Sequence, residues 1–161
     1  APADPEAPEA AVVDEARAET PVAEAPEPDP PPAEAEPPAP PAAGALLARA
    51  NQARRERRYP VAIRTYRYLQ RLHPRSREAA LSHVILGRLL LDGTGDAAGA
   101  LREFDRYLGQ RRHRVLDEEA RVGKALALQR LGRREAERRA WRALLEHHPD
   151  TLHAERARRR L

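Results

Sequence analysis

A short phrase recurs three times between residues 45 and 161, and it constrains the fold more than any other feature of this chain. In each copy a small residue lies four or five positions before an aromatic residue. The aromatic residues are Tyr66, Phe104 and Trp141, so successive copies are 38 and 37 residues apart. A fixed period of this size is typical of helix pairs stacked in a solenoid. We therefore expect three helix pairs, and a function in binding rather than in catalysis.

The amino-acid composition divides the chain into two parts at residue 44. Residues 1–44 hold 13 of the 16 prolines and contain no Phe, Tyr, Trp, Leu or Ile. Such a segment buries too little apolar surface to offset the entropy lost on folding. We therefore predict a disordered, acidic Pro/Ala/Glu-rich linker over residues 1–44 and one helical domain over residues 45–161.

The two parts carry opposite charges. Eleven acidic residues and one arginine give residues 1–44 a net charge of −10, whereas 28 basic and 14 acidic residues give residues 45–161 a net charge of +14. The absence of cysteine excludes disulfides, thiolate metal ligands and a cysteine nucleophile. No apolar run approaches the roughly 18 residues that a membrane-spanning helix needs. Because the chain begins at alanine, we expect a processed protein, or a piece of one whose targeting segment lies upstream.

Apolar residues recur at helical spacing throughout residues 45–161, and no run alternates as a strand would, so we expect an all-α domain. Pro60 suits the first turn of the second helix, while Ser76 and Asp96 suit the N-caps of the third and fourth. We expect a loop over residues 92–96 and a left-handed glycine stop at Gly109.

The last part of the domain has weaker boundary signals. Val115 is expected on the apolar face of the fifth helix. A short seventh helix is expected to close the domain, capped by Asp150 or Thr151. The apolar residues expected on this seventh helix are Leu152, Ala157 and Leu161.

Three helix pairs with these spacings resemble tetratricopeptide repeats (TPR). The family's small residue on the first helix of each pair corresponds to Ala50, Gly87 and Ala125, and that on the second helix to Ala62, Ala100 and Ala136. Its aromatic residue corresponds to Tyr66, Phe104 and Trp141, and its proline to Pro74 and Pro149. The resemblance implies an α–α superhelix of three TPR-like pairs and a C-terminal capping helix. The small residues would let helices approach, and each aromatic ring would fill the gap to the neighbouring repeat.

The joints at residues 72–76 and 147–151 read Leu-His-Pro-Arg-Ser and His-His-Pro-Asp-Thr. They are similar to joints in bacterial outer-membrane assembly lipoproteins and in the periplasmic cell-division coordinator associated with the Tol–Pal system. The resemblance implies a protein-interaction scaffold of the bacterial periplasm or cell envelope, with an upstream anchor left open. A cytoplasmic location, and an extracytoplasmic tail of an anti-sigma-like regulator, stay open as alternatives.

In such an array the first helix of each pair would line the concave face, so its polar residues are the candidate binding residues. Arginine makes bidentate contacts with carboxylates, which indicates an acidic or C-terminal peptide, or a protein that presents one, as the partner. An ordinary solvated helix face would carry similar residues. The candidates are Asn51, Arg54, Arg55, Arg88, Gln129 and Arg130.

Arginine-rich clusters at residues 54–58, 111–114 and 156–160 leave other partners open. They suit an anionic polymer or nucleic acid, although no nucleic-acid fold signature accompanies them. The acidic linker is a third candidate, docking on the basic domain. The sequence has no catalytic triad pattern, phosphate-binding glycine loop or HExxH motif, so we expect neither enzyme activity nor a cofactor. The histidines His147, His148 and His153 lack an acidic ligand at matching spacing, so we expect no metal.

Overall fold

The computed structural model of the chain describes residues 39–110, 112 and 114–161. These residues form seven α-helices, a short π-helix and a 3-10 turn, and they contain no strand. The prediction of an all-α domain is therefore confirmed for this part of the chain. The disorder predicted for residues 1–44 falls almost wholly outside the described residues.

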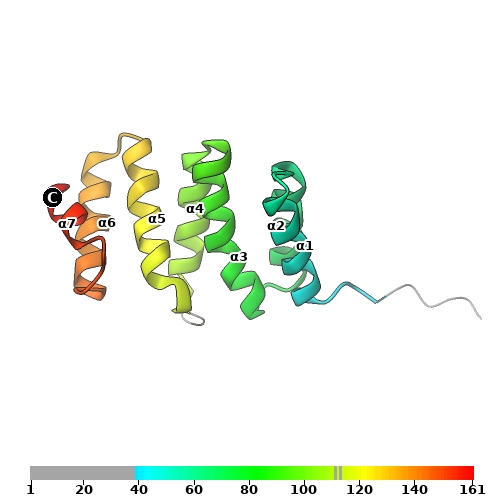
Figure 1. Ribbon diagram of the computed structural model, residues 1–161. Coiled ribbons are helices and arrows are strands. Elements are labelled where there is room, and N and C mark those ends of the chain that lie inside the picture. Colours follow the sequence, from blue (N-terminus) through cyan, green and yellow to red (C-terminus); the bar gives the residue numbers. More distant parts are fainter. Residues whose placement is uncertain (1–38, 111, 113) are drawn as a thin grey trace, which may run out of the picture. The chain divides into compact units, whose positions relative to one another are not determined.

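The helices pack in sequential pairs, as Figure 1 shows. Each pair also contacts the next, through α2 with α3 and α4 with α5, and α3 touches both α1 and α5. The first helix begins two residues before the expected start of the domain at residue 45. The pairs are α1 (Ala43–Arg55) with α2 (Tyr59–Leu72), α3 (Arg77–Arg88) with α4 (Ala97–Leu108), and α5 (Asp117–Arg130) with α6 (Arg134–His147), followed by α7 (Ala154–Arg159) against α6.

Three predicted helix starts are confirmed. Pro60 lies in the first turn of α2, where its missing N–H costs no hydrogen bond. The hydroxyl of Ser76 accepts a hydrogen bond from the N–H of Ala79 at 3.0 Å. The carboxylate of Asp96 accepts one from the N–H of Gly99 at 2.7 Å. Each cap satisfies a backbone donor that the first turn of its helix leaves unpaired.

The loop predicted over residues 92–96 is wrong for its first three residues. The chain after α3 continues as a π-helix, η1 (Leu89–Thr94), in which the hydroxyl of Thr94 donates to the carbonyl of Leu90 at 3.1 Å. All three leucines of η1 are buried, and their burial explains why the chain stays helical beyond the end of α3. The reversal is then made by Gly95, whose φ of +75° suits glycine.

Two expectations between α4 and α5 are also wrong. Gly109 has a φ of −72°, so the end of α4 is right-handed and needs no glycine. Val115 is 67% exposed in a 3-10 turn, η2 (Arg114–Leu116), that precedes α5. The N–H of Leu116 donates to the hydroxyl of Tyr107 at 2.8 Å, which ties this turn to α4 and leaves Val115 on the surface.

Neither Asp150 nor Thr151 caps α7, which begins at Ala154. The hydroxyl of Thr151 instead donates to the carboxylate of Glu118 on α5, so this segment is held by a tertiary contact rather than by a cap. Of the three apolar residues predicted for α7, Ala157 is buried, whereas Leu152 and Leu161 are exposed.

The three aromatic residues of the recurring phrase are fully buried in one continuous core. Phe104 shows why small residues accompany them. A Cβ atom added at Gly87 of α3 would lie 2.8 Å from the Phe104 ring, and one added at Gly123 of α5 would lie 2.3 Å from it. The ring of α4 therefore packs directly on the backbones of two neighbouring helices.

Candidate functional site

Two of the six predicted binding residues, Arg54 of α1 and Arg88 of α3, line the same pocket. The pocket has a volume of about 450 Å³ and lies on the side where the first helices of successive pairs meet. One aromatic and three aliphatic side chains also line it, so a charged group held by the two arginines would have apolar neighbours. These apolar residues are Tyr59, Val84, Ile85 and Leu89.

Two carboxylates, Asp92 and Glu119, also line this pocket. Asp92 is paired, because its carboxylate lies 3.1 Å from the guanidinium of Arg130, a third predicted residue. Arg130 donates to the carbonyl of Leu91 as well, which fixes its head at the pocket's edge. Glu119 has no ion-pair partner among the described residues. Counting Arg54, Arg88 and Arg130 against Asp92 and Glu119, the pocket and its edge together have one positive charge in excess.

The other three predicted residues make contacts elsewhere. Asn51 accepts a hydrogen bond from the hydroxyl of Tyr66 at 2.6 Å, which joins α1 to α2, and burial raises the pKa of that hydroxyl. Gln129 accepts one from Arg156 of α7 at 3.3 Å. Arg55 is exposed and donates to Gln52 on its own helix. The side chains of Asn51 and Gln129 therefore form hydrogen bonds that connect one helix to another.

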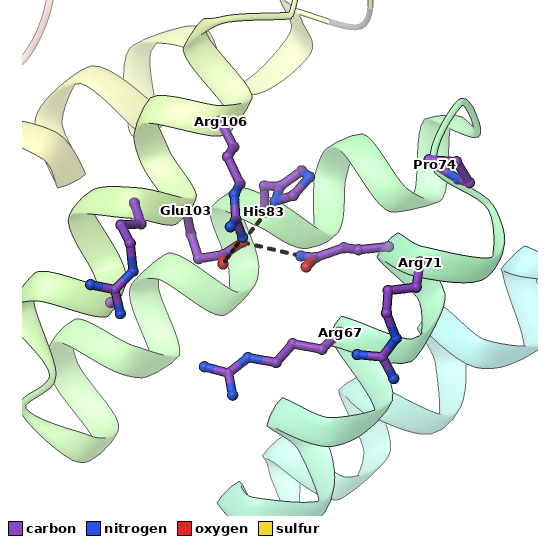
Figure 2. Close-up of a pocket in the computed structure, with 9 residues that line it drawn as sticks. Arg67, Arg71, Pro74, His83, Glu103 and Arg106 are labelled. Atoms are coloured by element: carbon purple, nitrogen blue, oxygen red, sulfur yellow. Dashed lines mark hydrogen bonds and ion pairs between the residues drawn. The ribbon is translucent and has the colours of Figure 1, made fainter.

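A second pocket, which the sequence did not predict, lies between α2 and α4 (Figure 2). It has a volume of about 510 Å³ and is lined by arginines from both helices. Each of the two helices contributes a pair of arginines that are four residues apart in the sequence, and this spacing places both members of a pair on one helix face. No local sequence pattern shows that the arginine-bearing faces of α2 and α4 meet across α3. The arginines are Arg67 and Arg71 of α2, and Arg102 and Arg106 of α4.

A buried carboxylate lies at the centre of this second pocket. Glu103 is 4% exposed, and its oxygens lie 2.7 Å from Nδ1 of His83, 2.9 Å from Arg106 and 3.2 Å from the amide of Gln70. Burial opposes ionisation, but the hydrogen bond and charge of His83 and the charge of Arg106 outweigh it and lower the pKa of Glu103. The carboxylate is therefore ionised at neutral pH with both oxygens engaged.

The described residues contain no group of three or more His, Cys, Asp or Glu side chains that could hold a metal ion. Two of the histidines considered as ligands have separate partners. His147 contacts the carbonyl of Ala143 at 2.9 Å, and His148 contacts Asp117 at 3.0 Å. Within the same part of the chain, every helix is too short or too polar to cross a bilayer.

Comparison with known proteins gives no family for this chain. No protein-family model matches it, and no curated protein matches its sequence.

Proposed function

We propose that the helical domain is a TPR-like array of three pairs and a capping helix that binds a protein partner. The buried aromatic rings at matching positions of each pair support this architecture, as does the sequential packing of the helices. The matching small residues are buried as well, except Ala136 of the third pair, which is partly buried. Each pair leaves an apolar face that its neighbour covers, which is how such repeats obtain a continuous core. The array is a binding scaffold and has no catalytic role.

The partner binds on the side of the first helices, through a peptide that carries an acidic side chain or a C-terminal carboxylate. The observation that carries this proposal is the meeting of Arg54 and Arg88 on one open pocket with an apolar lining. Guanidinium groups bind carboxylates in a bidentate manner, and apolar walls strengthen such a contact by excluding water. Arg130 neutralises Asp92 at the pocket's edge and so limits its repulsion of the ligand.

The scaffold acts in the bacterial cell envelope. This part of the proposal rests on the joints at residues 72–76 and 147–151, which are similar to those of envelope repeat proteins. Fractionation of the native cells tests it, because the protein should appear in the periplasmic or membrane fraction. Recovery with the cytoplasmic proteins alone would contradict this location.

Peptide display on the 161-residue chain tests the binding proposal. Selected peptides should share an acidic residue or a free C-terminal carboxylate next to an apolar residue. Calorimetry then measures their affinity for the double variant Arg54→Gln/Arg88→Gln. We expect a loss of about tenfold or more, since two charge-assisted contacts are removed.

The double variant Arg49→Gln/Arg142→Gln is the matched control. It removes the same charge from two exposed arginines that have no ion-pair partner among the described residues and that do not line this pocket. Equal losses in the two variants would contradict a site at Arg54 and Arg88. A steep dependence of affinity on salt without any peptide preference would instead favour an anionic polymer as the partner.

A further inference from the structure

The pocket between α2 and α4 lies apart from the proposed partner site. On α3, His83 lines this pocket and Arg88 lines the other. Five residues along a helix correspond to a rotation of about 140° between their side chains. The two pockets thus open on different sides of α3, and a ligand in one does not occupy the other.

The arginines of this pocket exceed its acidic groups. Glu103 is the one carboxylate in the lining, and its oxygens already contact His83, Gln70 and Arg106. In the described part of the chain, neither Arg67 nor Arg71 nor Arg102 has an ion pair or a side-chain hydrogen bond. Three guanidinium groups therefore face one cavity without an internal counter-charge.

The spacing of the arginines on each helix makes the excess of positive charge unfavourable when no ligand is bound. Arg67 and Arg71 are four residues apart on α2, and Arg102 and Arg106 are four residues apart on α4. Like charges at this spacing repel each other on a helix surface. In Figure 2, Arg67 extends from α2 and Arg106 from α4 toward the region of Glu103. A bound anion would relieve the repulsion on both helices at once.

We propose that this pocket binds a small oxyanion carrying two or more negative charges, held by Arg67, Arg71 and Arg102. Arg106 remains paired with the buried Glu103, which fixes the position of its guanidinium. The planar guanidinium fork matches the oxygens of phosphate and carboxylate groups equally well. The shared chemistry of the ligand is therefore that of a phosphate compound or a polycarboxylate.

The size of the pocket suits an organic or condensed anion better than a single ion. Its volume of about 510 Å³ falls in the range of roughly 300–1,000 Å³ that is usual for small-molecule sites. The lining comes from three helices, α2, α3 and α4, which distinguishes this pocket from a stripe of charge along one helix. A small ligand fits this geometry better than a polymer.

Calorimetric titration of the 161-residue chain tests the proposal, with pyrophosphate and citrate as separate probes at constant ionic strength. At least one probe should bind saturably. The double variant Arg67→Gln/Arg102→Gln should weaken that binding by about tenfold or more, because two charge-assisted contacts are lost. Tighter binding of pyrophosphate assigns the ligand to the phosphate class, and tighter binding of citrate assigns it to the polycarboxylates.

The matched control is again Arg49→Gln/Arg142→Gln, which removes the same charge outside this pocket. The affinity of this control variant for the probe should stay within about twofold of that of the unsubstituted chain. Far-UV circular dichroism checks that each variant is folded, and the single change Arg71→Gln gives an independent second variant. Absence of saturable binding for both probes, or equal losses in pocket and control variants, would overturn the proposal.

Discussion

Phe104 is packed directly against two neighbouring helices. Its ring lies against the backbones of α3 and α5 because residues 87 and 123 have no side chain. Protein interiors are packed as densely as organic crystals, so a single added methyl group at such a contact is felt. The glycines at these two positions set how closely three helices approach one another.

Gly123→Ala should destabilise the domain by about 1–3 kcal/mol, because the new Cβ would lie 2.3 Å from the Phe104 ring. Urea unfolding measures the change in the free energy of unfolding. Gly44→Ala is the matched control, since no atom lies within 4 Å of a Cβ added there. Alanine is the better helix former, so the control should be unchanged or slightly more stable. Equal effects at both positions would refute close packing at Gly123.

Trp141→Ala should destabilise by roughly 3–5 kcal/mol, the usual cost of truncating a large buried aromatic residue. The ring is fully buried, and its N–H donates to Glu137 at 3.2 Å. Thermal unfolding monitored by circular dichroism measures the loss. An unchanged melting midpoint would be incompatible with this burial.

Position on a helix face could be predicted from the sequence, because it depends on spacing alone. Together with the expected stacking of the first helices, this predicted that Arg54 and Arg88 lie on the same side of the array, and the two residues line one pocket. The contact between Asn51 and Tyr66 joins residues 15 positions apart, so it depends on how α1 packs on α2 and on two side-chain rotamers. For the same reason the arginine pocket between α2 and α4 could not be predicted from either helix by itself.

At the scale of elements, the starts of α3 and α4 follow local chemistry, whereas the end of α3 and the start of α7 depend on tertiary packing. Ser76 and Asp96 act as caps within four residues of their targets, so the sequence reveals them. The end of α3 and the start of α7 depend instead on contacts with residues that are far away in the sequence. Leu91 keeps η1 helical, and the contact of Thr151 with Glu118 delays α7. The spacing of apolar residues along the chain does not predict such long-range contacts.

Charged contacts join α7 and the residue that follows it to α6, beside the buried Ala157. Arg160 donates to both oxygens of the buried Glu137, at 2.7 and 2.9 Å, and Arg156 lies 5.8 Å from the centre of the Trp141 ring. Arg160→Gln should therefore lower the melting temperature, because Glu137 would lose its charged partner in a buried position.

Arg158→Gln is the matched control for Arg160→Gln. Arg158 is exposed on α7, two residues before Arg160, and has no ion pair with any described residue. Differential scanning calorimetry should detect a lower melting temperature for Arg160→Gln and almost none for the control. Equal shifts would show that net charge, rather than the contact with Glu137, supports α7.

At the scale of the whole described domain, three buried carboxylates are distributed over successive helices. They are Glu103 of α4, Asp117 of α5 and Glu137 of α6. Burial opposes the ionisation of Glu103 and Asp117, but their hydrogen bonds and basic neighbours outweigh it, and the pKa of each is lowered. Hydrogen bonds from Arg160 chiefly lower the pKa of Glu137. Each group thus favours the folded state when it is ionised.

The domain should lose stability in acid. A carboxylate whose pKa is lower in the folded state stabilises above its unfolded pKa, and that contribution disappears as the pH falls through the folded pKa. Because unfolded Asp and Glu titrate near pH 4, the free energy of unfolding should fall below about pH 5. Urea unfolding at a series of pH values measures this slope.

The variant Glu103→Gln should flatten the acid slope, since one of the three buried carboxylates with a lowered pKa is removed. Glu146→Gln is the matched control, because Glu146 is exposed on α6 and has no ion pair among the described residues. A slope that is unchanged in Glu103→Gln, or equally reduced in both variants, would contradict this role for the buried carboxylate.

The burial of Trp141 beneath α7 has an optical consequence. It is the only tryptophan in the chain, and it lies in the last helix pair of the described residues. Its fluorescence therefore reports the unfolding of that end, whereas far-UV ellipticity averages over every helix. In stacked repeats each unit is stabilised by its neighbours, so an end pair can melt before the centre. A fluorescence midpoint below the ellipticity midpoint would reveal such fraying without any added label.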